Sequence, residues 1–81
     1  MIKHRYLVEY VHLDGNRYRI GETNIPELAQ ALADEAAVSP TIRRLHLPVL
    51  ITDRENPERG DLNGRLLDYE AEQVPLNWGS C

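Results

Sequence analysis

The chain has 81 residues and a mass of 9.3 kDa, which is the size of one small domain. A chain of this length buries only about 60–65% of the surface that it exposes when unfolded, which leaves one compact core and excludes large enclosed pockets. Hydrophobic residues make up 42% and charged residues 27%, as in folded domains, and the net charge of −4 lacks the basic excess of a nucleic-acid binder.

Residues 4–20 are predicted to form a β-hairpin. Aromatic and β-branched residues dominate the first half, and Asp-Gly-Asn at 14–16 tolerates the backbone of a tight turn. A three-residue loop would pair Tyr10 with Ile20, whereas a two-residue loop would pair Glu9 with Ile20. We prefer the three-residue loop, because it leaves Glu9, Arg17 and Arg19 together on the solvent face. The opposite face would then be apolar, with Tyr6, Val8, Tyr10, Tyr18 and Ile20.

Residues 24–37 are predicted to form a helix. Asn24 and Glu27 have the spacing of a capping box, and Pro26 is tolerated in the first turn. Ser39 precedes Pro40, which pushes it out of the α region and should end the helix. Apolar residues at the helical period would face the sheet, namely Ile25, Leu28, Ala29, Leu32 and Ala36.

Residues 42–52 are predicted to form a second β region. Its alternating apolar residues would share one face, namely Leu45, Leu47, Val49 and Ile51. Pro48 has no N–H donor, so this strand should lie at an edge of the sheet.

Residues 53–63 are predicted to form a charged loop with proline and glycine, and loops of this length often carry function. The net charge of the chain lies in and just after this loop. Residues 1–52 carry six basic and six acidic side chains, whereas residues 53–72 carry three arginines and seven acids, and 3 − 7 gives the whole −4. This acidic segment favours a basic partner surface, and a solvated acidic face without a partner is the alternative interpretation.

Residues 64–74 fit either a strand or a helix. Leu67, Tyr69 and Ala71 alternate as in a strand, whereas the residue types favour a helix. We prefer a strand, because the edge strand at 42–52 needs a partner. The expected fold is therefore a single α+β domain with the order ββαββ, in which one helix packs on one face of an antiparallel sheet.

Residues 75–81 are predicted to form a loop-like tail. Trp78 in this tail would either close the edge of the core or anchor a partner. Cys81 is the only cysteine, so no disulfide can form within the chain. The N-terminus lacks the apolar run of a signal peptide, and no run approaches the roughly 20 residues of a membrane span. We therefore expect a cytoplasmic protein of a bacterium or a phage-infected host cell, with no membrane partner.

No sequence pattern indicates catalysis or metal binding. Paired Cys-x-x-Cys, His-Glu-x-x-His, calcium-loop and Gly-x-Ser-x-Gly patterns do not occur in the sequence. The carboxylates of residues 53–72 are numerous, but without a pocket they are not evidence of acid–base catalysis. We expect no catalytic residue, no metal, no cofactor and no small-molecule substrate.

Residues 28–45 resemble a helix-turn-helix of the repressor type. An alanine-rich helix leads through Val38 and Ser39 to Arg43 and Arg44, which would lie on the recognition helix. The turn glycine of such motifs is replaced by Ala37, and the second helix would run into a proline. The resemblance implies a DNA-binding regulator, and a helix followed by an edge strand is the alternative interpretation.

In size, acidity and single-sheet layout, the chain resembles the small proteins with which phages and mobile elements block host defence, of which anti-CRISPR proteins are the best known. The resemblance is one of architecture and transfers no functional residue. It implies binding to a large host complex by surface complementarity, without catalysis.

Three functional hypotheses follow. The first is a non-enzymatic protein-binding module, with an inhibitor of a nucleic-acid-handling complex as its specific form. Its acidic contact surface would comprise Glu55, Glu58, Asp61, Asp68, Glu70 and Glu72, with Trp78 as an added anchor. The second is a DNA-binding regulator that uses residues 28–45. The third is a structural homodimer paired through the edge strand at 42–52.

Overall fold

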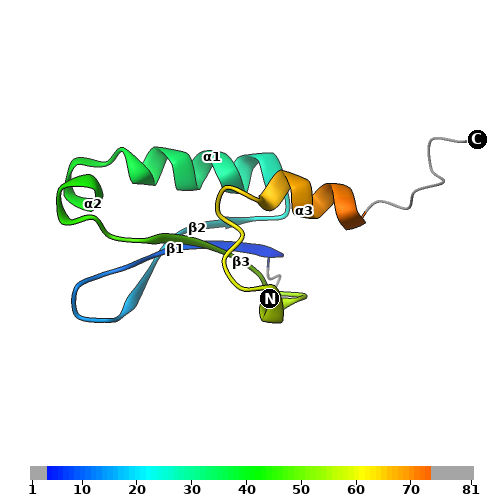
Figure 1. The fold of residues 1–81 in the computed structure, drawn as a ribbon, viewed down its shortest axis with the longest axis horizontal. Coiled ribbons are helices and arrows are strands. Elements are labelled where there is room, and N and C mark those ends of the chain that lie inside the picture. The colour runs from blue at the N-terminus through cyan, green and yellow to red at the C-terminus, as the bar shows by residue number, and fades with distance from the viewer. Residues whose placement is uncertain (1–3, 74–81) are drawn as a thin grey trace, which may run out of the picture.

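The computed structural model describes residues 4–73 as one antiparallel sheet with helices (Figure 1). The strands are β1 (Tyr6–Val11), β2 (Arg17–Thr23) and β3 (Val49–Asp53). The helices are α1 (Pro26–Ala37), α2 (Pro40–Leu45), the 3-10 turn η1 (Pro57–Arg59) and α3 (Leu66–Gln73). The strand order is β2-β1-β3, and α1 lies across one face of the sheet (Figure 1). The expected α+β class is confirmed.

The hairpin forms, but in neither of the two expected registers. Tyr10 pairs with Tyr18, because the loop consists of residues 13–15. The His12 N–H donates to the Asn16 carbonyl at 3.0 Å, and the Gly15 N–H donates to the His12 carbonyl at 2.9 Å. Gly15 has a φ of 85°, a conformation that glycine adopts without steric cost and that this short loop requires.

A β-bulge in β2 shifts the register a second time. Glu9 pairs with Arg19, whereas Val8 pairs with Gly21, so Ile20 is an extra residue on β2. The expected apolar face forms in part in spite of the shift, since Tyr18 is 40% exposed. Tyr6 and Val8 are fully buried, Ile20 packs partly against the core, and the rings of Tyr10 and Tyr18 stack at 5.4 Å.

Helix α1 begins two residues later than expected, at Pro26. It ends at Ala37, shortly before Ser39 and Pro40, as the proline predicted. Its N-cap residue is Ile25, which makes no side-chain cap, so the predicted capping box is wrong. The Asn24 side chain instead accepts the Arg5 N–H at 2.8 Å and ties the start of β1 to the start of α1. Ser39 is extended, with a ψ of 134°, and Pro40 then begins α2.

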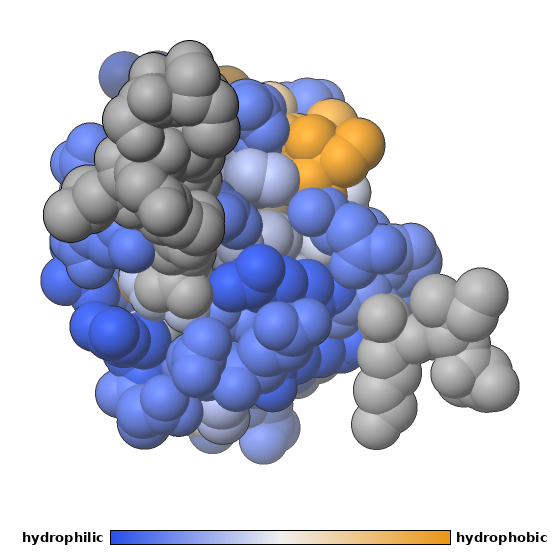
Figure 2. Space-filling model, turned by 90° about the vertical axis from the view of Figure 1, so that its right-hand side faces the viewer, coloured by the Kyte–Doolittle hydropathy of each residue, from blue (hydrophilic) through white to orange (hydrophobic). Residues whose placement is uncertain are grey.

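The buried face of α1 is built from alanines. Ala29, Ala33 and Ala36 pack on the sheet, whereas Ile25 is 54% exposed and Leu28 is 47% exposed. The predicted apolar stripe is therefore only partly right. The alanines allow a close approach of the helix to the sheet, and Ile25 and Leu28 lie on the flank of the helix, beside the buried face. The end of the molecule where α1 begins shows one hydrophobic patch on a hydrophilic surface (Figure 2).

The strand predicted at 42–52 is wrong in its first half. Residues 40–45 form helix α2, which ends at His46 in the left-handed conformation, with a φ of 54°. Strand β3 begins only at Val49, after Pro48. It is an edge strand, as expected, but its partner is β1, with Val8 opposite Ile51.

The preferred strand at 64–74 is also wrong, because residues 66–73 form helix α3. Its buried residues Leu66 and Tyr69 are one helical turn apart and belong to the core between α3, α1 and the end of β3, where the Tyr69 hydroxyl donates to Asp53. The predicted loop at 53–63 is irregular apart from η1 and the final residue of β3, Asp53. The tail with Trp78 lies outside the described residues.

Candidate partner-binding surface

The most buried carboxylate of the acidic segment is Asp53, which lies in a polar network. Its side chain is fully buried and accepts hydrogen bonds from Arg5 Nε at 3.1 Å and Arg5 Nη2 at 3.0 Å. The Tyr69 hydroxyl and the Glu55 N–H also donate to it. Burial raises the pKa of Asp53, but the bonds from Arg5 and Tyr69 outweigh it and lower this pKa to about 2. Asp53 therefore joins the N-terminal segment, β3 and α3.

Three of the six predicted contact residues take part in the fold. Arg5 lies 3.7 Å from a Glu55 carboxylate oxygen and 3.8 Å from one of Glu70. Asp61 accepts the N–H of Ile51 at 3.0 Å and the N–H of Asn63 at 2.9 Å. These carboxylates are held by groups of the same chain, so they are poor candidates for partner contact.

Glu22 forms a second charged cluster, which the sequence analysis missed. Its carboxylate lies 3.2 Å from His4 Nδ1, 3.3 Å from Arg19 Nη1 and 2.9 Å from Arg54 Nη2. The hydrogen bond with His4, followed by the charges of Arg54 and Arg19, lowers the pKa of Glu22. The cluster joins β2 to His4, which precedes β1, and to Arg54, which follows β3, and we assign it a structural role.

The other three predicted contact residues, Glu58, Asp68 and Glu72, are exposed. Within residues 4–73, none of them has a cationic nitrogen within 4.0 Å. Asp68 and Glu72 are one turn apart on α3 and line a hollow of about 290 Å³ beside Tyr69. Arg59 and Arg65 line the same hollow, and Arg65 donates to the carbonyls of residues 59 and 61.

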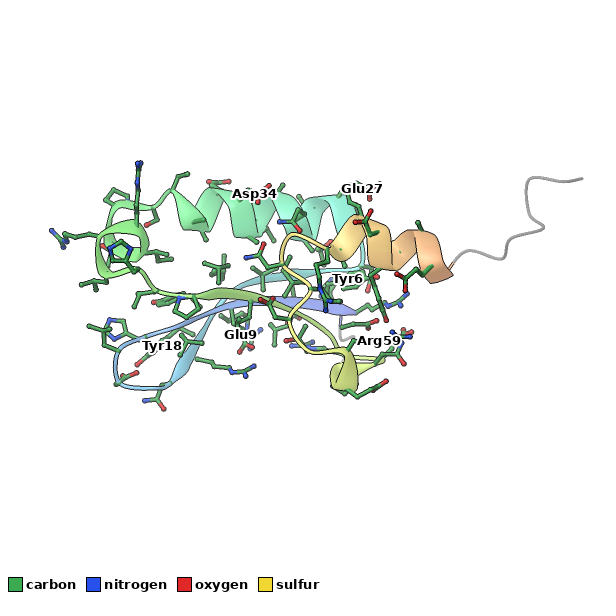
Figure 3. The ribbon with its side chains drawn as sticks, in the orientation of Figure 1. Tyr6, Glu9, Tyr18, Glu27, Asp34 and Arg59 are labelled. Carbon is green, nitrogen blue, oxygen red and sulfur yellow. The ribbon has the colours of Figure 1, made fainter. Side chains whose placement is uncertain are left out.

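Helix α1 adds two carboxylates to this side of the molecule. Glu27 and Asp34 are two turns apart, are exposed, and project from the side of α1 that faces away from the sheet (Figure 3). Asp34 and Asp68 line one hollow of about 400 Å³ between α1 and α3. We call Glu27, Asp34, Asp68 and Glu72 the helical acidic surface. Among the described residues, the only hydrogen bond or ion pair made by any of these four carboxylates is the one that Asp34 accepts from Gln30 Nε2 at 3.0 Å.

Half of this surface is predictable from the acidic segment of the sequence. Asp68 and Glu72 were predicted from the acidic segment, whereas Glu27 and Asp34 were missed because residues 1–52 are neutral as a sum. Their seven-residue spacing on a predicted helix was an available signal. The contact between α1 and α3, which brings the four together, depends on tertiary packing.

The arginines of the helix-turn-helix interpretation lie on α2. Arg43 and Arg44 are both exposed in its last turn, and within the described part of the chain neither lies within 4.0 Å of a carboxylate oxygen. Helix α2 has six residues, fewer than two turns. At the sheet end occupied by α2, the molecule therefore presents a small basic surface.

Neither a metal site nor a membrane span is found in the part of the chain that the structure describes. No three His, Cys, Asp or Glu side chains of residues 4–73 are grouped so that they could hold a metal ion. No helix among these residues is long and apolar enough to cross a bilayer. No protein-family model matches the chain, and comparison with curated proteins and with solved structures finds no similar protein.

Proposed function

We propose that the chain is a non-enzymatic protein-binding module that meets a basic surface of its partner through the helical acidic surface. The observation that carries this proposal is the contrast between two sets of carboxylates. Asp53 and Glu22 are held by arginines of the same chain, whereas Asp34 and Asp68 share a hollow and have no cationic partner within 4.0 Å among residues 4–73. Like charges held together on a rigid surface repel each other, and a cationic partner relieves that repulsion.

The position of the surface supports this interpretation. Helix α1 packs on the sheet and α3 packs on α1, while the Tyr69 hydroxyl of α3 donates to Asp53 at the end of β3, so the carboxylates of both helices are held in a fixed arrangement. A rigid patch of one sign increases the association rate with an oppositely charged surface and disfavours partners of the same sign. The specific form of the proposal is an inhibitor that occupies a basic nucleic-acid channel, where its carboxylates take the place of phosphates.

A pair of variants with equal charge change tests the location of the surface. The probe is a fluorescein-labelled octa-arginine peptide, titrated with the full chain at low and at moderate salt. Asp34→Lys/Asp68→Lys should weaken binding several-fold more than Glu55→Lys/Glu58→Lys, although both change the net charge by four. Equal weakening would mean that only net charge matters and would overturn the proposal. If Glu55→Lys/Glu58→Lys weakened binding more, the partner-binding surface would instead lie at residues 55–58.

A second candidate function is favoured by the observation that residues 40–45 are helical. Arg43 and Arg44 lie on α2 without a carboxylate partner among the described residues, as a short DNA-contacting helix would require. Fluorescence anisotropy with a labelled mixed-sequence duplex at low salt tests this function. Micromolar, salt-dependent binding that Arg43→Ala/Arg44→Ala removes would support a DNA-binding regulator. Absence of binding would reject it.

A further inference from the structure

The two edges of the sheet differ in whether the chain itself covers them. Along β3, the Asn63 side chain donates to the Val49 carbonyl at 2.7 Å. The Ile51 N–H is bound by Asp61, and the Ile51 carbonyl accepts the Leu62 N–H at 2.8 Å. The edge at which the sequence analysis placed a homodimer contact is therefore occupied by residues 61–63.

Strand β2 forms the other edge and pairs only with β1 among the described strands. The Val11 N–H donates to the Pro48 carbonyl, so the odd-numbered residues of β1 point their backbone groups toward β3. In an antiparallel pair, the residues opposite them point away from β1. The residues that direct their backbone groups to the open edge are therefore Arg17, Arg19 and Glu22.

An apolar flank of α1 lies directly beside this open edge. A Cβ placed on Gly21 of β2 would lie 3.1 Å from Leu32 Cδ1, so α1 crosses very close to the edge strand. Ile25, Leu28 and Leu32 follow one side of the helix, and the first two are half exposed. A hollow of about 340 Å³ lined by Ile20 and Leu32 continues this side toward the end of α1.

We propose that this edge and flank form a dimerisation surface whose occupant is a second copy of the chain, with β2 pairing antiparallel to β2 of the copy. The charge order along β2 supports this occupant. Arg17 and Arg19 precede the bulge and Glu22 follows it, so an antiparallel pairing of the outward residues sets an arginine of each chain opposite Glu22 of the other. There it would add to the cluster that Glu22 forms with His4, Arg19 and Arg54 of its own chain. Without the bulge, Gly21 would point outward in place of Glu22.

The two-fold symmetry also brings the apolar flanks together. A two-fold axis perpendicular to the sheet leaves both copies of α1 on the same face of a continuous six-stranded sheet. Each apolar flank then faces the other across the new pair of strands. Burial of Leu28 and Leu32 provides apolar area that the edge hydrogen bonds alone do not supply. The acidic surface defined by Asp34 and Asp68 takes no part in the contact.

Sedimentation equilibrium of the full chain over a range of concentrations tests the dimer, with two matched variants. Leu28→Glu lies on the flank and Leu67→Glu lies on α3, and the native side chains are 47% and 51% exposed. We expect a concentration-dependent dimer that Leu28→Glu weakens at least about tenfold and Leu67→Glu leaves unchanged. A monomer at all concentrations up to about 1 mM, or equal effects of both variants, would overturn the proposal.

Hydrogen exchange of the native chain locates the contact without any substitution. The amide protons of Arg17, Arg19 and Glu22 point to the open edge, so they should exchange more slowly as the concentration rises through the dimer range. The amide of Ile51, which is already bound by Asp61, should not respond to concentration. Concentration-independent exchange at the three β2 positions in a sample that does dimerise would place the contact elsewhere.

Discussion

The two edges of the sheet show two different uses of charged residues. At the β3 edge, Asp61 binds the backbone N–H of Ile51, and residues 61–63 complete the hydrogen bonds of the strand. At the β2 edge, Arg17 and Arg19 are more than half exposed and the backbone beside them has no strand partner within residues 4–73. An exposed edge is open to pairing with another chain, and charged side chains and bulges restrict that pairing to strands whose charges match across the new pair. One carboxylate of the acidic segment, Asp61, thus helps to close the β3 edge, whereas the β2 edge has no such cover among the described residues.

The largest expected effect concerns Asp53, at the end of the closed β3 edge. Asp53→Ala removes the partner of Arg5 and leaves Tyr69 without its acceptor, so we expect a loss of about 3–5 kcal/mol in the free energy of unfolding. Urea denaturation followed by circular dichroism measures this loss. Asp53→Asn is the control, because it keeps the shape and an acceptor and should lose less. Equal losses in both variants would show that charge, and not the loss of an acceptor, dominates.

The same network predicts how stability depends on pH. The pKa of Asp53 is lowered from its ordinary value of 3.8 to about 2, so the folded state favours the charged form. The stabilisation is complete above pH 3.8 and is lost as the pH falls toward 2, with a total of about 2 kcal/mol. Denaturation curves between pH 6 and 2 should show this loss, and Asp53→Asn should flatten that part of the profile. A native profile as flat as that of the variant would contradict the network.

A smaller effect is expected at the cover of the β3 edge. Asp61→Ala removes the acceptor for the Ile51 N–H, which then lies partly buried without a partner, at a cost of about 1–2 kcal/mol. The thermal midpoint measures the change. Asp61→Asn retains a side-chain oxygen and should recover most of the stability. If Asp61→Ala also increased dimerisation, the uncovered β3 edge would have become a second pairing site.

The smallest expected effect lies on the open edge. Arg19→Ala should change the free energy of unfolding by less than about 0.5 kcal/mol, because Arg19 is exposed and Glu22 keeps His4 and Arg54 as partners. Chemical denaturation of the monomer at low concentration is the measurement. A loss as large as that of Asp61→Ala would show that the open edge is as important to the monomer as the closed one, and the comparison would fail.

Several features that local sequence controls were predicted correctly, although the capping box at Asn24 and Glu27 was not. The glycine at 15 marks the hairpin turn, and the residue before Pro40 marks the end of α1. The apolar face with Tyr6 and Val8 was also correct, because alternation along a strand is a local pattern. The register was not, because the loop consists of residues 13–15 and not of the expected 14–16, and the bulge at Ile20 then shifts the pairing a second time.

The remaining errors concern partners that are distant in sequence. Asp53 and Arg5 are 48 residues apart, and no local pattern distinguishes Asp53 from the exposed acids that follow it. Helix α3 was predicted as a strand because a partner was sought for the edge strand. In the structure, that edge is covered by the irregular residues 61–63. Helix α2 appeared only in the helix-turn-helix alternative, because the alternating apolar residues that begin at Leu45 were extended back to residue 42 as a strand.

By itself, the sequence determined the fold class, the hairpin turn, the end of the first helix and the excess of carboxylates after residue 52. These features depend on backbone preferences and composition, which act over a few residues. Only the tertiary structure decided which carboxylates bind arginines, which edge of the sheet stays open and which acids of α1 and α3 share a surface. Those outcomes depend on burial and on contacts between distant residues, so they arise only when the whole chain is packed.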